Sequence, residues 1–261
     1  MKKLSKFLYN SGYRSIAIIS FIVLWELLPR LGLVNQTYLS PPSQVVLAIR
    51  DLFTTGDLWV HVQSSLQRSL SGLILAIASG TLLGLLLGWF KKFEELVDPL
   101  LQLFRQVSAF ALFPVFILFL GIGEVSKTAI IFWAAFFPIL LNTVNGVKHV
   151  DQLLIASARS MGASQNYIFR KVVLPAAAPG IFTGIRLGGA YCITALVAAE
   201  MIGAASGLGF YILNSQETFQ IPHMYAGIIL LAFIGLGLNY ILALIESYFT
   251  KWKKGLYSNE A

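Results

Sequence analysis

Long apolar runs, each close to the length that crosses a lipid bilayer, dominate this sequence. A helix needs about 20 mostly apolar residues to span roughly 30 Å of hydrocarbon. We interpret six runs as membrane-spanning helices, over residues 15–33, 69–90, 107–122, 128–147, 177–202 and 224–249. The sequence therefore predicts an all-α, polytopic membrane bundle of about six transmembrane helices.

The composition supports a membrane protein and argues against a soluble nucleic-acid binder. Only 12% of the 261 residues are charged and 57% are hydrophobic, whereas soluble domains carry about 25% charged residues. The net charge of +7 would suit nucleic acid, but basic residues that flank membrane spans explain it better in so apolar a chain. We expect the partner surface to be a lipid bilayer and not a nucleic acid.

The basic residues also predict an orientation. If six spans alternate from a cytoplasmic N-terminus, 14 of the 19 lysines and arginines lie on the cytoplasmic side and 4 outside, with Arg186 inside a span. The positive-inside rule then places segments 1–14 and 251–261 in the cytoplasm, around a membrane domain of residues 15–250. The first run could instead be a signal peptide, but it ends in Leu28-Pro29-Arg30 without a small-residue cleavage site, so we favour a retained span.

Small residues recur at every fourth position in the second and fifth runs. In lipid, helices associate through close backbone approach at small side chains, because the hydrophobic effect does not draw them together. This spacing predicts helix–helix contacts. The glycines concerned are Gly80, Gly84, Gly88, Gly180, Gly184 and Gly188.

A polar passage over residues 148–176 interrupts the apolar runs on the cytoplasmic side. Residues 152–161 are good helix formers, and Gly162 can adopt the left-handed conformation that ends a helix. Ser164 can cap a second helix, and Leu174-Pro175 breaks that helix or starts the next one. The spacing predicts a helix, a glycine turn and a second helix. It leaves open whether another protein docks there or the passage is simply a solvated loop.

This passage resembles the cytoplasmic loop signature of permease subunits of binding-protein-dependent ABC importers. The signature reads Glu-Ala-Ala, three variable residues, Gly, and a hydrophobic-x-Leu-Pro ending, and its counterparts here are Ala156-Ser157-Ala158, Gly162 and 172–175. Ala156 departs from the usual glutamate, which removes any salt bridge at that position. In the family this loop is the coupling helix that seats on the ATPase subunit. The resemblance implies docking residues Ala156, Ser157, Ala158, Arg159, Gly162, Ala163, Ser164, Leu174 and Pro175.

Further stretches look like the branch of this family that imports nitrate, taurine and aliphatic sulfonates. They are LSPPSQV, FPVFILFLGIGEVSK, FFPILLNTVNGV, LPAAAPGIFTGIR and LVAAEMIGAASGLG, so the resemblance covers about residues 15–250. It implies the type I importer fold in a bacterial cytoplasmic membrane, a permease homodimer, two ATPase subunits and an extracytoplasmic solute-binding protein. It also implies a small, anionic solute. Gln106 lies in a segment where many relatives have proline, which leaves the start of the third span open.

Polar and charged groups within the runs are candidates to line a translocation path, because such groups are costly in a membrane. The candidates are Arg105, Arg186, Asn142 and Glu200. Each has a structural alternative. Arg186 can pair with a carbonyl or carboxylate, Arg105 can extend to the inner surface, and Asn142 can bond a neighbouring helix. For Glu200 we favour a structural pair or a gate hydrogen bond.

The sequence predicts no catalytic, nucleotide or metal site of its own. No Gly-Lys pair is present, so there is no Walker A loop, and ATP with Mg²⁺ would bind to partner ATPase subunits. Cys192 is the single cysteine, and the three histidines lack ligand spacing. Gly203, Gly207 and Gly209 lack the phosphate-loop pattern, which favours an outer turn that helps to contact the binding protein.

Two functions without an ATPase partner remain as alternatives. A secondary transporter predicts inverted repeats and discontinuous helices, and we find neither pattern. An intramembrane enzyme predicts paired acid–base groups at membrane depth, but the close pair His149 and Asp151 lies at the edge of the cytoplasmic loop.

Overall fold

The computed structural model describes the backbone of residues 2–250 and the side chains from residue 16 onward. The predicted tail 251–261 and the side chains of the predicted segment 1–14 lie outside the described residues. Every regular element within the described range is helical. In chain order these are α1 (Lys2–Arg30), α2 (Pro42–Thr55), α3 (Asp57–Trp89), α4 (Lys91–Phe104), α5 (Phe113–Leu120), α6 (Glu124–Lys148), α7 (Gln152–Ser160), α8 (Gln165–Ile168), the π-helical turn η1 (Phe169–Val173), α9 (Leu174–Met201), α10 (Leu208–Glu217) and α11 (Ile221–Phe249).

Four helical stretches of the described residues are long and apolar enough to cross a membrane. They are α3, α6, the continuous run from Gln165 to Met201, and α11. They correspond to the predicted second, fourth, fifth and sixth spans, although α3 begins twelve residues earlier than predicted and α3 and α9 each end one residue before the predicted bound. The predicted first span lies mostly in α1, which ends at Arg30.

Helix α6 lies between α3 and α9, in contact with a row of glycines on each. A Cβ atom at Gly84 of α3 would lie 2.6 Å from the Thr143 Cβ, and one at Gly88 would lie 2.7 Å from the Val147 Cβ. The partners advance together along both helices, so α3 and α6 run in the same direction. On the other side, a Cβ at Gly180 would lie 2.8 Å from the Gly146 Cα. Larger residues could not fit at these contacts.

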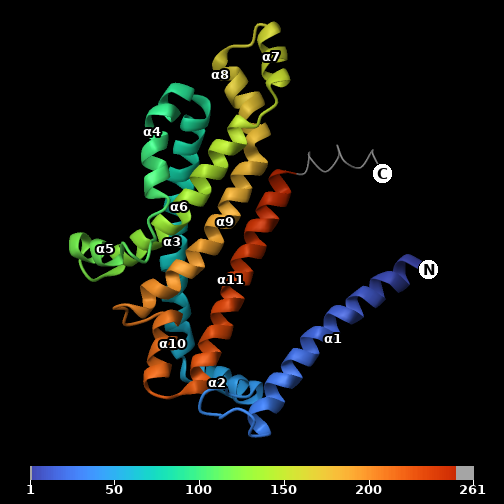
Figure 1. Cartoon of the computed structure of the whole chain (residues 1–261), viewed down its shortest axis with the longest axis vertical. Coiled ribbons are helices and arrows are strands. Elements are labelled where there is room, and N and C mark those ends of the chain that lie inside the picture. The colour runs from blue at the N-terminus through green and yellow to red at the C-terminus, as the bar shows by residue number, and fades with distance from the viewer. Residues whose placement is uncertain (1, 251–261) are drawn as a thin grey trace.

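The contacts of α9 with α6 run in the opposite sense. A Cβ at Gly184 would lie 2.8 Å from the Asn142 Cβ, and one at Gly188 would lie 2.8 Å from the Ile139 Cδ1. Gly80 faces the same Ile139 from α3, where a Cβ would lie 3.1 Å from Cγ2. The predicted glycines therefore lie at the two interfaces that hold α6 in the centre of the bundle (Figure 1).

The structure differs from the prediction at the third span, because residues 107–122 do not form one helix. The chain turns over residues 105–112, and α5 then contributes only eight residues, about 12 Å of helix. Pro114 lies in the first turn of α5, and proline disfavours a helical conformation in the residue before it. Gly121 ends α5 with φ +78°. Since α3 and α6 are parallel, α4 and α5 together must make the return between them, in two pieces (Figure 1).

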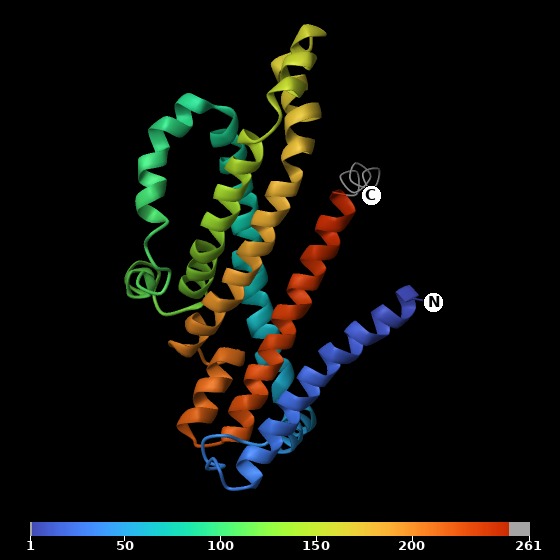
Figure 2. The ribbon, with the colours of Figure 1, turned by 45° about the vertical axis from the view of Figure 1, so that its right-hand side comes forward.

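The remaining helices pack around this bundle. Helix α2 buries Val45, Ala48 and Leu52 beside α11. Helix α1 diverges from the bundle toward its N-terminal end (Figure 2). The end of α1 near α2 is held by the Glu26 carboxylate, which accepts hydrogen bonds from the Ser43 amide and hydroxyl at 3.0 and 2.8 Å. Helices α7 and α8 project beyond the bundle at one end, and α2 and α10 lie at the other end.

Candidate functional site

The projecting segment, residues 152–168, has the predicted order of helix, glycine turn and helix. Asp151 caps α7 by accepting a hydrogen bond from the Leu153 amide at 2.8 Å. Gly162 has φ +78° and open space around its Cβ position. Ser164 caps α8 by accepting from the Tyr167 amide at 3.3 Å. We call this segment the coupling element. The start of each of its two helices is therefore fixed by the side chain of the residue just before it.

The coupling element is anchored by a few apolar side chains and leaves others exposed. Ala158 and Ile168 are buried against the base of the element. Among its exposed apolar residues are Met161, 81% exposed, and Tyr167, 56% exposed. The predicted docking residues Ala156, Ser157, Arg159, Gly162 and Ser164 are also exposed, whereas Ala158 is buried and Ala163 and Leu174 are half-buried. The coupling element therefore exposes apolar as well as polar side chains.

A π-helical turn joins the coupling element to α9. The Leu174 amide donates to the Phe169 carbonyl, five residues back. This wider turn accommodates Pro175, which has no amide hydrogen to donate. The helix continues from Gln165 to Met201, so Leu174-Pro175 does not break it. Helix α8 is therefore continuous with a helix that is long and apolar enough to cross a membrane.

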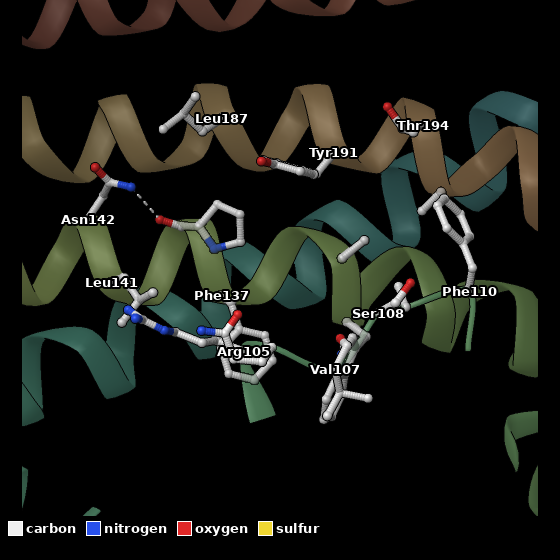
Figure 3. A pocket seen from close by; sticks show the side chains of 16 residues that line it. Arg105, Val107, Ser108, Phe110, Phe137, Leu141, Asn142, Leu187, Tyr191 and Thr194 are labelled. Atoms are coloured by element: carbon white, nitrogen blue, oxygen red, sulfur yellow. Dashed lines mark hydrogen bonds between the residues drawn. The ribbon is translucent and has the colours of Figure 1, made fainter. Parts of the chain in front are cut away.

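A pocket of about 620 Å³ opens between α6, α9 and the turn at 105–110 (Figure 3). Within the described part of the chain, its lining includes one cation, Arg105, and no carboxylate. The other polar side chains in the lining are Gln106, Ser108, Asn142, Tyr191 and Thr194. Such a lining can hold a small anion through one fixed charge and several hydrogen-bond donors.

The four predicted path residues do not come together. Arg105 and Asn142 line the pocket, and the Asn142 amide donates to the Pro138 carbonyl of its own helix at 2.8 Å rather than to a neighbouring helix. Arg186 lies outside the lining and pairs with Glu246 of α11 at 2.9 Å. Glu200 is fully buried in an ion cluster. For Arg186 and Glu200 the geometry therefore matches the structural alternative, since each has a charged partner between helices.

Sequence reasoning missed the pocket residues of α9. Leu187, Tyr191 and Thr194 all line the pocket. Their spacing by four and three residues marks one helix face, next to the face that carries the glycines. That periodicity was available in the sequence. The contribution of Gln106 and Ser108 was not, because it depends on the turn that replaces the predicted third span.

Sequence reasoning also missed an ion cluster at the end of the bundle opposite the coupling element. Arg68 of α3 pairs with Glu124 of α6 and with Glu200 of α9, at 2.5 and 2.9 Å. Lys127 pairs with the same Glu124 at 3.2 Å. Arg68 and Lys127 are both buried, so these two cations are neutralised within the protein.

Comparison with known families decides what this arrangement is. The family described as "Binding-protein-dependent transport system inner membrane component" matches residues 80–254. The chain belongs to this family. It is the permease subunit of a binding-protein-dependent ABC importer, a multi-pass protein of the inner membrane, and ATP hydrolysis in such a system is the work of another subunit.

Two named relatives cover most of the permease. It is 38% identical over 232 residues to the putative aliphatic sulfonates transport permease protein SsuC of Bacillus subtilis, covering 89% of this chain and 84% of the relative. It is 34% identical over 236 residues to the taurine transport system permease protein TauC of Escherichia coli, covering 88% and 86%.

A solved structure supports the fold. The permease superposes on an inward-facing structure of the MetNI methionine ABC transporter with a TM-score of 0.62, at 21% identity, covering 74% of this chain and 97% of that one. The helical bundle described above is therefore the fold of an ABC importer permease.

Proposed function

We propose that two copies of this permease form a translocation path for a small anion of the sulfonate or taurine class. The single observation that carries the solute class is the pocket beside α6 and α9, where Arg105 provides positive charge without an acidic residue in the lining. The similarity to SsuC and TauC supports the same class of solute. Glu200 and Arg186 take no part in binding the anion on this proposal.

The distribution of charge supports a cytoplasmic position for the coupling element. Six exposed lysines and arginines lie near it, namely Lys91, Lys92, Lys148, Arg159, Arg170 and Lys171. Among the side chains that the structure describes, only Arg30 and Arg50 are exposed cations at the opposite end, because Arg68 and Lys127 are buried in ion pairs. By the positive-inside rule the coupling element faces the cytoplasm and α10 faces outward. With α1 as the first crossing and α4–α5 as the third, six crossings place both termini inside.

In this orientation the coupling element meets the ATPase subunit, which binds ATP and Mg²⁺. Two ATPase subunits serve two permease copies, and a solute-binding protein docks on the outer ends. ATP drives the cycle because the ATPases bind it with different affinity in the two states of the permease. The exposed Met161 and Tyr167 supply apolar contact area for docking.

Co-purification tests the docking assignment. Gly162→Pro imposes φ near −65° where the chain has φ +78°, so we expect weaker recovery of the ATPase without loss of membrane insertion. Gly56→Pro is the matched control, because Gly56 has φ +82° and open space at the opposite end. Normal ATPase recovery with the Gly162 variant would contradict the assignment.

Uptake into vesicles tests the pocket. Radiolabelled taurine, methanesulfonate and nitrate are compared, each with its partner binding protein in excess. We expect Arg105→Gln to lower anion uptake about tenfold, the loss of one charge-assisted hydrogen bond, and Arg105→Lys to restore part of it. If the Gln variant takes up the anions as fast as the unchanged permease, the positive charge of Arg105 has no part in binding the solute.

A further inference from the structure

Arg68 occupies the centre of the outer ion cluster and uses all of its hydrogen-bond donors. Its Nε and Nη2 donate to the two Glu124 oxygens at 2.5 and 2.8 Å. Its Nη1 donates to the Glu200 carboxylate at 2.9 Å and to the Ser206 carbonyl at 2.6 Å. Nη2 also reaches the Ser206 hydroxyl at 3.4 Å. A guanidinium has five N–H groups, and this one joins α3 to α6, α9 and the loop before α10.

Glu200 is enclosed by the same loop. Its carboxylate accepts from the Ser65 hydroxyl at 2.8 Å and from the Gly209 amide at 2.8 Å, in addition to Arg68. A Cβ at Gly207 would lie 2.3 Å from the Glu200 carboxylate carbon. Only glycine can therefore stand at position 207, and the backbone of the loop wraps directly around the buried carboxylate.

Two short segments meet beside this cluster, and we call them the outer rim: residues 121–123 before α6 and residues 202–207 after α9. A Cβ at Gly203 would lie 3.5 Å from the Ile122 Cγ2. Ile122 is 77% exposed and Ile202 is 50% exposed. Ile202 follows the last pocket residue of α9, Ala195, by seven residues, about 10 Å along a helix. The outer rim thus lies beyond the pocket on its outer side.

We propose that Arg68 and Glu200 are positioning residues that hold the outer rim on α3, and that the 202–207 segment stays attached to α3 throughout the transport cycle. This rests on the orientation given under the proposed function. Arg68 holds one side of the rim through Glu124 and the other through Ser206 and Glu200. The rim therefore presents one fixed surface to the binding protein.

Burial explains why this attachment is permanent. The Glu200 side chain is completely buried and that of Arg68 is 5% exposed. Moving the end of α9, and the loop that follows it, away from α3 would leave the opposite charges of Glu200 and Arg68 without each other in a nonpolar environment, which costs far more than breaking an exposed pair. The Arg186–Glu246 pair, with side chains 44% and 22% exposed, has no such constraint.

A disulfide tests the permanence of the attachment. The hydroxyl oxygens of Ser64 on α3 and Ser206 in the loop lie 2.9 Å apart, so Ser64→Cys with Ser206→Cys places two thiols in bonding range. The Ser206 carbonyl that binds Arg68 is retained. Cys192 is fully buried and so does not compete for oxidation. Peptide mapping under non-reducing conditions confirms the bond.

The readout is ATP hydrolysis by the whole reconstituted complex, stimulated by its binding protein loaded with taurine, methanesulfonate or nitrate. We expect the cross-linked complex to retain at least about half of the stimulated rate, since a constraint on groups that do not separate costs little. A loss of about tenfold or more that dithiothreitol reverses would overturn the proposal. Failure of the unmodified complex to respond to any of the three solutes would instead count against the proposed solute class.

Substitution of Glu200 tests its positioning role. Glu200→Gln keeps the shape and removes the charge that Arg68 binds, so we expect about a tenfold higher concentration of binding protein for half-maximal stimulation. Unstimulated ATP hydrolysis should not change, because the coupling element is at the other end. Ser65→Ala removes one donor to Glu200 and should give a smaller shift, and Glu246→Gln is the control. Equal half-maximal concentrations in all four proteins would overturn the positioning role. If Glu200→Gln does not fold, Ser65→Ala still tests the positioning role and the disulfide still tests the attachment of the loop.

Discussion

The bundle core and the coupling element use small residues in opposite ways. At Gly84 in the core, an added Cβ would lie within 2.6 Å of α6, whereas Gly162 in the coupling element has nothing within 4 Å. In the core the small residue brings two helices of the same chain together. In the coupling element it fixes a turn and leaves open space around it, at the place where we propose that the ATPase docks. The same residue type therefore serves a close helix–helix contact in the core and an open, left-handed turn in the coupling element.

The largest expected effect comes from filling a core contact. Gly84→Leu must displace the Thr143 side chain and the Leu140 carbonyl, which lies 2.9 Å from the Cβ position, and overpacking of this kind costs about 1–3 kcal/mol or more. We expect loss of most of the monodisperse protein extracted from membranes. Gly237→Leu on α11, with open space, is the control. Equal yields of both variants would show that α3 and α6 do not touch.

The next effect is expected at the surface of the coupling element. Met161→Asp puts a charge at an 81% exposed apolar position, so folding should be unaffected while a desolvated contact with the ATPase is lost. We expect the affinity of the ATPase to fall by about tenfold or more, measured by titration in nanodiscs. The control is Tyr240→Asn, 66% exposed on α11. Unchanged affinity would mean that this face of the coupling element is not the contact.

A smaller effect is expected from strain in the glycine turn. Gly162→Ala and Gly56→Ala each place a Cβ at positive φ, which costs about 1–2 kcal/mol, with no clash in either case. Both should lower thermal stability slightly. Only the first should weaken ATPase binding, by about threefold, because only its turn shapes the coupling element. If both variants lose the same affinity for the ATPase, the Gly162 turn has no special role in ATPase binding.

The smallest effect is expected at Arg186. Its pair with Glu246 is partly exposed, and such pairs contribute about 0–1 kcal/mol. We expect Arg186→Gln to leave the preference among taurine, methanesulfonate and nitrate unchanged in uptake assays. A changed preference among the three solutes would mean that Arg186 lines the translocation path.

The sequence was informative where one local rule determines the structure. Gly162 acts through its own backbone conformation and Ser164 through a side-chain cap on an amide three residues later, so the helix–turn–helix could be predicted from residue types. The four-residue glycine spacing likewise predicted the contacts of α6. By contrast, the break at 105–112 depends on how α4 and α5 pack beside α6, and apolar content alone made residues 107–122 look like one span.

The ion cluster shows a different limit. Arg68 looks like an ordinary flanking charge in the sequence, because its partners Glu124 and Glu200 lie on other helices, whereas Lys127 pairs with Glu124 three residues earlier on its own helix. Only the parallel arrangement of α3 and α6 brings Arg68 to Glu124. The same limit applies to the pocket, where Arg105 lies near Asn142 because the chain turns between α4 and α5.

Thiol cross-linking from the two ends tests the central claim most directly. The two sites are Met161 on the coupling element and Phe219 at the turn between α10 and α11, which are almost equally exposed, at 81% and 79%. Each is replaced by cysteine, as Met161→Cys and Phe219→Cys. The buried Cys192 serves as an internal negative control. With a short thiol-to-amine cross-linker added to the intact complex in membranes, we predict an adduct of the ATPase with the Met161 variant and none with the Phe219 variant. An ATPase adduct at Phe219, or at neither position, would contradict the claim that the coupling element is the site where the ATPase acts on the membrane helices.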